Sequence, residues 1–173
     1  MRTMLGVAAM FAVAACGGSK APPKLPASTA GPAAGPPAAE RPIGTSGFPG
    51  LDWGDRDDKI KPMYPGAEDY ETGTAWHGTV DGLPADVSFS IGNSTGLQQI
   101  DVAWKDTYPT MDACGEVLHR LKPIYEQRLG PSSEENLALF WDTGKASVTL
   151  ACNPDDAMHG SLSASYQQQR PPE

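Results

Sequence analysis

Short segments in which apolar and polar residues alternate make up much of the chain between residues 76 and 166. Val87, Phe89 and Ile91, for example, are separated by serines. A two-residue period turns the apolar side chains of a β-strand to one face and the polar side chains to the other. We therefore expect a sheet with one apolar face, whose strands include residues 76–80, 86–91, 99–104, 137–141, 146–152 and 161–166.

The links between these segments are short and rich in turn-forming residues. Residues 81–82 are Asp-Gly, and residues 142–144 are Asp-Thr-Gly. Such residues adopt the left-handed backbone conformation that tight hairpins need. Residues 92–96, Gly-Asn-Ser-Thr-Gly, have similar composition, and we interpret them as a loop between two strands. Links this short predict antiparallel pairing.

Residues 110–129 have the period of a helix instead. Their apolar residues recur three or four positions apart, so they share one face of a helix that packs on the sheet. The sequence therefore predicts an α+β fold, an antiparallel sheet packed by helices, in a single domain at residues 47–167. The residues on the helix face are Met111, Cys114, Val117, Leu118, Leu121 and Tyr125.

Two of the three cysteines, Cys114 and Cys152, lie in the expected domain. Cys114 is on the inward face of the helix and Cys152 on the apolar face of its strand, so both thiols point into the core. We expect a disulfide between them. It would close a loop of about 39 residues and stabilise the fold by roughly 3 to 4 kcal/mol on the chain-entropy estimate. A metal or catalytic thiol pair is the alternative, although such sites use closer cysteine spacing.

The N-terminus has the form of an export signal. An apolar run, residues 4–13, is too short to span a bilayer and follows a short basic start. It leads into Val-Ala-Ala-Cys at residues 13–16, which resembles the lipobox of bacterial lipoproteins. The resemblance implies removal of residues 1–15 and lipidation of Cys16. With Gly18 two positions later, it also implies anchoring in the outer membrane of a Gram-negative bacterium, facing the periplasm.

Residues 16–46 are expected to form a disordered tether. Proline, alanine and glycine make up most of the segment that follows Cys16, a composition that does not supply a packed core. A short tail, residues 168–173, is expected to be disordered as well. Without the signal, which contains Arg2, the chain holds 12 basic and 21 acidic residues, a net charge of −9. This charge disfavours nucleic acid as a partner.

A weak internal repeat appears when the second half of the domain is aligned with the first at a constant offset. The matches fall at a helix end, a hairpin turn and two strands, so each half would have one helix followed by three strands. The first helix would be short, with Asp55 as its N-cap. The matched pairs are Lys61 with Lys122, Pro62 with Pro123, Tyr64 with Tyr125, Asp81 with Asp142, Ala85 with Ala146, Val87 with Val148, and Ala103 with Ala164.

This element order resembles that of two kinds of bacterial protein, the outer-membrane assembly lipoproteins of the BamE/SmpA type and the β-lactamase inhibitor protein. The former have one helix-and-sheet unit and the latter a tandem pair, and both act by binding other proteins. The resemblance implies a protein-binding role, and it assigns no contact residue to a position in this chain. Residues 48–54, Phe-Pro-Gly-Leu-Asp-Trp-Gly, also resemble the segment that opens the domain of some small bacterial lipoproteins.

The residue patterns do not indicate catalysis, a cofactor or a metal. His77, His119 and His159 lie far apart in the sequence and form no ligand motif. The serines lack the Gly-x-Ser-x-Gly pattern of a nucleophile elbow. Four aspartates between residues 52 and 58 would suit calcium, but they lack the glycine and distal glutamate of a calcium-binding loop. Capping of the first helix explains the same aspartates.

The polar face of the sheet is the candidate binding surface. Its residues are small and hydroxylic, with few lysines and glutamates, whereas solvated strands usually carry more charge. Such a surface lets a partner approach closely, and a plain solvated sheet face is the alternative. The candidate residues are Thr79, Ser88, Ser90, Gln99, Ser147, Thr149, Ser161, Ser163 and Ser165.

These features predict a lipid-anchored periplasmic lipoprotein that acts as a non-catalytic protein-binding or envelope-assembly module. We expect it to contact the membrane through its lipid and to bind an envelope or secreted protein. Two alternatives stay open from the sequence: a secreted-enzyme inhibitor or immunity-type lipoprotein, and a periplasmic hydrolase. A deep pocket that holds a histidine and a carboxylate within hydrogen-bond reach would favour the hydrolase.

Replacing Cys16 with serine tests the anchor. We expect the Cys16→Ser variant to accumulate as an unprocessed precursor without lipid, because serine has no thiol to accept the diacylglycerol group. Metabolic labelling with a fatty acid and mass spectrometry of the N-terminus measure the two properties. Normal lipid labelling of the variant would contradict the assignment.

Overall fold

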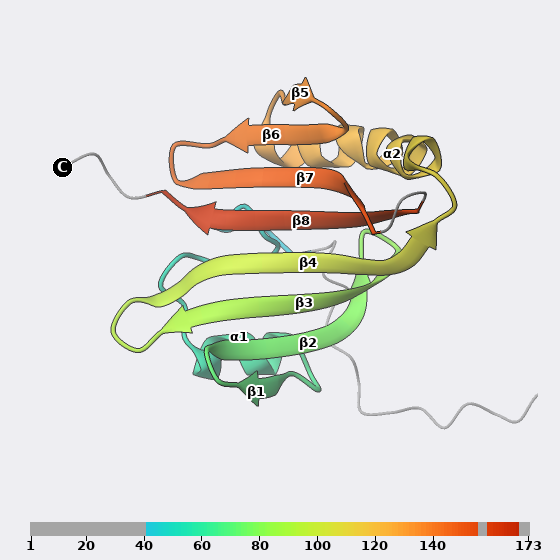
Figure 1. Ribbon diagram of the computed structural model, residues 1–173. Coiled ribbons are helices and arrows are strands. Elements are labelled where there is room, and N and C mark those ends of the chain that lie inside the picture. Colours follow the sequence, from blue (N-terminus) through green and yellow to red (C-terminus); the bar gives the residue numbers. More distant parts are fainter. Residues whose placement is uncertain (1–40, 156–158, 170–173) are drawn as a thin grey trace, which may run out of the picture. The chain divides into compact units, whose positions relative to one another are not determined.

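The computed structural model describes residues 41–155 and 159–169, and the fold is α+β, as the sequence predicts (Figure 1). Eight strands form one antiparallel sheet, and two helices, α1 (Asp57–Met63) and α2 (Met111–Leu129), pack on it. The strands are β1 (Glu68–Tyr70), β2 (Gly73–Val80), β3 (Leu83–Gly92), β4 (Gly96–Tyr108), β5 (Ser133–Glu135), β6 (Ala138–Asp142), β7 (Ala146–Pro154) and β8 (Gly160–Gln168).

Several expectations concern parts of the chain outside the described residues. These are the signal sequence at 1–15, the lipidation site Cys16, residues 17–40 of the tether and residues 170–173 of the tail. The predicted strands, the long helix and the short turns all lie within the described residues. There the hairpin at residues 81–82 has the predicted positive φ angles, 52° and 82°.

The element order repeats along the chain. The strands lie in the order β1-β2-β3-β4-β8-β7-β6-β5, so β4 and β8 join two halves that each contain one helix followed by four strands. The prediction of three strands per half is therefore one strand short. The additional strands, β1 and β5, are three residues long and exposed at every position. Because no side is buried, they show no alternation of apolar and polar residues.

The predicted constant offset between the halves holds for β3 and β7 but not for β4 and β8. Val87 and Val148 are both buried in the middle of their strands. Ala103 is exposed whereas Ala164 is buried, so these alanines lie on opposite faces and their predicted match is wrong. The links before these strands differ in length, since three residues join β3 to β4 and five join β7 to β8. The strand register gives the full shift. Val87 pairs with Val102 and Val148 pairs with Tyr166, so the offset of 61 residues between β3 and β7 becomes 64 between β4 and β8. This shift of three is odd, and an odd shift exchanges the two faces of a strand.

Both helices lie on the apolar face of the sheet, and the described residues place no helix on the other face (Figure 1). In α2 the predicted inward residues Cys114, Leu118 and Tyr125 are buried, and the helix packs mainly on β7 and β8. The Thr110 side chain caps this helix by accepting a hydrogen bond from the Ala113 amide. Within the described ranges, neither helix is long and apolar enough to cross a bilayer.

The prediction that Asp55 caps α1 is wrong. Arg56 precedes the helix, and its side chain makes no capping hydrogen bond. The Asp55 carboxylate instead accepts a hydrogen bond from the Asp52 amide at 2.8 Å and pairs with Lys59 one helical turn later. Asp55 therefore holds the turn before the helix rather than the first helical amides.

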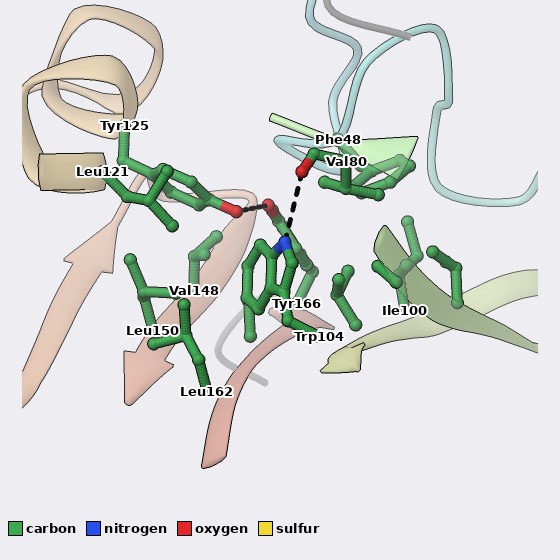
Figure 2. Close-up of a cluster of buried hydrophobic side chains, with 14 of the residues drawn as sticks. Phe48, Val80, Ile100, Trp104, Leu121, Tyr125, Val148, Leu150, Leu162 and Tyr166 are labelled. Atoms are coloured by element: carbon green, nitrogen blue, oxygen red, sulfur yellow. Dashed lines mark hydrogen bonds between the residues drawn. The ribbon is translucent and has the colours of Figure 1, made fainter. Parts of the chain in front are cut away.

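The core is a cluster of buried side chains between the sheet and the elements that cover it (Figure 2). Phe48 lies among residues of both halves: its ring centre is 6.3 Å from Phe89 and 6.3 Å from Tyr64, and 5.3 Å from Tyr166. Phe89 and Tyr64 belong to the first half, and Tyr166 belongs to β8 of the second. Burying one aromatic ring against both halves favours their close packing.

The polar atoms of the buried aromatic residues in this cluster are hydrogen-bonded (Figure 2). The Tyr166 hydroxyl donates to the Tyr125 hydroxyl at 3.1 Å, which joins β8 to α2. The Trp104 indole donates to the Val80 carbonyl oxygen at 3.2 Å. These bonds offset the cost of removing the polar groups from water.

Residues 41–56, the strap, cross the apolar face before α1 and supply Phe48. The Arg41 guanidinium donates to the Met63 carbonyl oxygen at 2.6 Å and lies over the Tyr64 ring. Ser46 is fully buried, and its hydroxyl donates to the Leu51 carbonyl oxygen. The packed region thus includes residues 41–46, which the sequence analysis assigned to the tether.

The predicted disulfide joins Cys114 of α2 to Cys152 of β7. Their Cα atoms are 6.0 Å apart, within the range that a disulfide spans. The helix face and the strand face on which the cysteines lie both point into the core, as expected. The bond ties α2 to the sheet of its own half.

A nearly buried ion pair connects the two halves at the end of the sheet. The Arg128 guanidinium of α2 donates to the Asp81 carboxylate of the β2–β3 turn at 2.6 Å. The Asp81 side chain is 2% exposed and the Arg128 side chain 16% exposed. A buried charge of this kind destabilises a fold strongly when its partner is removed.

Removal of Arg128 tests how tightly this contact holds the halves together. We expect Arg128→Met to lower the free energy of unfolding by about 3 kcal/mol, because it leaves the Asp81 charge buried without a cation. Denaturant unfolding followed by circular dichroism measures the loss. Lys145→Met, which removes an exposed cation, is the matched control and should change stability by less than about 0.5 kcal/mol.

The double variant Arg128→Met/Asp81→Asn distinguishes charge from packing. Asparagine tolerates the positive φ angle of residue 81 and carries no charge, so most of the lost stability should return. If the double variant is as unstable as Arg128→Met alone, the cost does not come from the unpaired carboxylate.

Candidate functional site

All nine predicted face residues lie on the side of the sheet that the helices leave uncovered. The strand register places Ser88 opposite Asp101, Asp101 opposite Ser165, and Ser165 opposite Thr149. Alternation along each strand adds the others. We call this surface the open face; its predicted residues are Thr79, Ser88, Ser90, Gln99, Ser147, Thr149, Ser161, Ser163 and Ser165. A binding role for them stays a prediction.

One row of residues runs across six strands of the open face. Strands are about 4.8 Å apart, so the row spans about 24 Å. It contains one aromatic residue at one end, one carboxylate near the middle, and small side chains elsewhere. The row consists of Phe140 (β6), Thr149 (β7), Ser165 (β8), Asp101 (β4), Ser88 (β3) and Ala75 (β2).

A shallow hollow of about 250 Å³ lies on the open face over β2, β3, β4 and β8. Ala75, Ala103 and Ser163 are among the residues that line it, and their short side chains leave space above the strands. Two carboxylates, Asp86 and Asp101, also line the hollow. The register places Asp86 opposite Ala103 and Asp101 opposite Ser88, so the carboxylates are diagonal neighbours on adjacent strands.

Asp86 has cationic or potentially cationic neighbours. His77 Nδ1 lies 2.6 Å from the carboxylate and Lys105 Nζ lies 2.9 Å from it. The hydrogen bond from His77, together with that from Lys105, holds the pKa of the Asp86 carboxyl below its usual value. All three side chains are about half exposed or more, so solvent screens their attraction.

Asp101 is held by neutral groups. Gln99 Nε2 donates to both carboxylate oxygens, at 3.0 and 2.8 Å, and the Ser165 hydroxyl donates to Oδ1 at 2.8 Å. Among the described residues, no lysine, arginine or histidine nitrogen lies within 4 Å of this carboxylate. The Asp101 charge is therefore fixed in position without a cation beside it.

Phe140 is a residue of the open face that the sequence analysis missed. It is 39% exposed and lies on β6 between the inward residues Leu139 and Trp141. Residues 137–141 are all apolar and hide the alternation, so the sequence alone does not show on which face Phe140 lies. The structure shows its orientation: both neighbours in the strand, Leu139 and Trp141, are buried, so Phe140 points to the open face. Aromatic residues, phenylalanine among them, are enriched at the cores of protein interfaces.

The hydrolase alternative depends on a deep pocket with a histidine and a carboxylate in contact. His77 and Asp86 are in contact, but they lie in a shallow hollow and the His77 side chain is 63% exposed. His119, on the exposed side of α2, pairs with Glu134 of β5. Neither histidine–carboxylate pair lies in the deep pocket that would favour a hydrolase.

The aspartates near α1 are engaged in local hydrogen bonds. The Thr45 amide donates to Asp52, and this bond lowers the pKa of the Asp52 carboxyl. Asp57 accepts a hydrogen bond from the buried Thr74 hydroxyl at 2.6 Å. In the part of the chain that the structure describes, no three or more histidine, cysteine, aspartate or glutamate side chains are placed to hold a metal ion.

Residues 41–155 and 159–169 thus belong to the class of α+β proteins in which a repeated helix-and-strand unit builds one sheet with an uncovered face. Comparisons of the chain with protein-family models, with curated proteins and with solved structures find no match.

Proposed function

We propose that the protein is a lipid-anchored lipoprotein of the outer membrane, facing the periplasm, and that its open face binds an envelope or secreted protein. In this proposal the protein has no catalytic role of its own. The observation that carries the proposal is the open face itself, which has small side chains across five long strands and an exposed aromatic residue on the sixth.

The size of the open face suits a protein partner. Strands β2, β3, β4, β7 and β8 are each eight residues or longer. At about 4.8 Å between strands and about 3.4 Å per residue, they present roughly 650 Å², before β6 is added. A stable protein interface buries about 800 Å² on each partner, so one face of this sheet is of the required order.

Two further observations support the proposed location. Residues 13–16 match the pattern of a lipobox, and Cys114 and Cys152 form a disulfide, as proteins of oxidising compartments commonly do. A lipid on Cys16 would restrict the partner to the envelope or to proteins that pass through it. The segment between Cys16 and the domain predicted at residue 47 would let the domain reach away from the membrane.

Photo-crosslinking from the open face tests the proposal. Benzoylphenylalanine is similar in character to phenylalanine, so it can replace Phe140 with little change to the surface. In cells of the source organism we expect the Phe140 variant to crosslink to one envelope or secreted protein in near-stoichiometric amount. The same amino acid at Gln127, exposed on α2, is the control and should not crosslink to that protein.

The crosslinking result can also contradict the proposal. If Phe140 gives no crosslinked protein, or if Phe140 and Gln127 give the same products, the open face is not the binding surface.

A further inference from the structure

The charges of the open face favour a basic partner. Five carboxylates point from it, and they outnumber Lys105 and the titratable His77. Complementary charge speeds association and disfavours partners of the wrong sign. The carboxylates are those of Glu68, Asp86, Asp101, Glu135 and Asp142.

The two carboxylates of the hollow are not equivalent. Asp86 already has Lys105 and His77 beside it. Asp101 receives hydrogen bonds only from neutral donors, Gln99 and Ser165, among the described residues. These bonds orient the Asp101 carboxylate and leave its charge uncompensated. A cation of the partner would therefore gain more electrostatic attraction beside Asp101 than beside Asp86.

The shape of the hollow suits a long side chain that ends in a cation. Ala75 and Ala103 line it with methyl groups. Lysine and arginine carry an aliphatic stem that packs on apolar surface while the charged end binds a carboxylate. Arginine has the better geometry, because its planar guanidinium offers parallel donors to a carboxylate.

We infer that the hollow receives an arginine or lysine side chain of the protein partner, with the cation at Asp101 and the stem over Ala75 and Ala103. This inference rests on the proposed function and names the chemistry of the partner. Phe140, at the other end of the same row, then contacts an apolar residue of that partner.

Titration with single-residue probes tests the hollow without knowledge of the partner. N-acetyl-arginine methylamide is added to the lipidated full-length protein, labelled with ¹⁵N, in detergent micelles at low ionic strength. N-acetyl-citrulline methylamide, in which a neutral urea replaces the guanidinium, is the matched probe. We expect the arginine probe to shift the amide resonances of Ala75, Ala103 and Ser163, and the citrulline probe to leave them nearly unchanged.

The Asp101→Asn variant assigns the effect to one charge. Asparagine keeps the size of the side chain and can still accept the Ser165 hydroxyl, so the local structure should persist. We expect the apparent affinity for the arginine probe to fall about tenfold. Glu116→Gln, which removes an exposed carboxylate from α2, is the control and should leave the affinity unchanged.

The outcomes separate this inference from the proposed function. Absence of shifts at the hollow, equal shifts with both probes, or unchanged affinity in Asp101→Asn overturns the inference, even if Phe140 crosslinks to a partner. A partner crosslinked through Phe140 whose binding is insensitive to Asp101→Asn also overturns it. Specific arginine binding that Asp101→Asn removes supports the inference, whether or not the crosslinking experiment succeeds.

Discussion

The pairing of β4 with β8 is the interaction on which the rest of the structure depends. It joins two units, each of one helix and four strands, into a single sheet. On the apolar side, Phe48 packs against Phe89 of one half and Tyr166 of the other. On the open side, the Ser165 hydroxyl of β8 bonds to Asp101 of β4. The seam between the halves is therefore both the centre of the core and the centre of the candidate binding surface.

The uncovered face follows from the repeat. Each unit places its helix on the same side of the sheet, and the strap fills that side further. The core residues are thus buried on one side of the sheet, and the other side needs only to stay soluble. Ordinary solvated strands meet that need with long charged side chains. Here alanine and serine dominate instead, and this choice is explained if a partner approaches the strands closely.

The larger elements of the fold could be predicted from the sequence because each has a strong period. The clear alternation of residues 146–152 places Cys152 on the apolar face of its strand, and the helical period of residues 110–129 places Cys114 on the inward face of the helix. These two placements predict the disulfide. The edge strands β1 and β5 could not be found, since every residue in them is exposed. The sequence does not predict the strap, because its side chains bond to particular backbone carbonyl oxygens. Arg41 donates to Met63 and Ser46 to Leu51, and residue composition does not encode such contacts.

Part of the candidate site was predictable as well. The hydroxyl residues of the open face followed from alternation alone, but their order across the sheet did not, because register depends on strand pairing. The placement of Asp101 beside Ser88 and Ser165, and of Phe140 at the end of the same row, required the strand order β3-β4-β8-β7-β6. A few such positions contribute most of the binding free energy of an interface, so the average composition of a surface does not identify them.

The central claim is that a partner covers the open face in the cell although nothing in the described part of the domain does. Its most direct test is the reactivity of a cysteine placed at Ala103, an exposed position in the hollow, toward a membrane-permeant maleimide. The account predicts rapid labelling of Ala103→Cys in the purified protein and labelling at least tenfold slower in the intact envelope, while Gln127→Cys on α2 reacts at the same rate in both. Equal labelling rates for Ala103→Cys in the two settings would contradict the account.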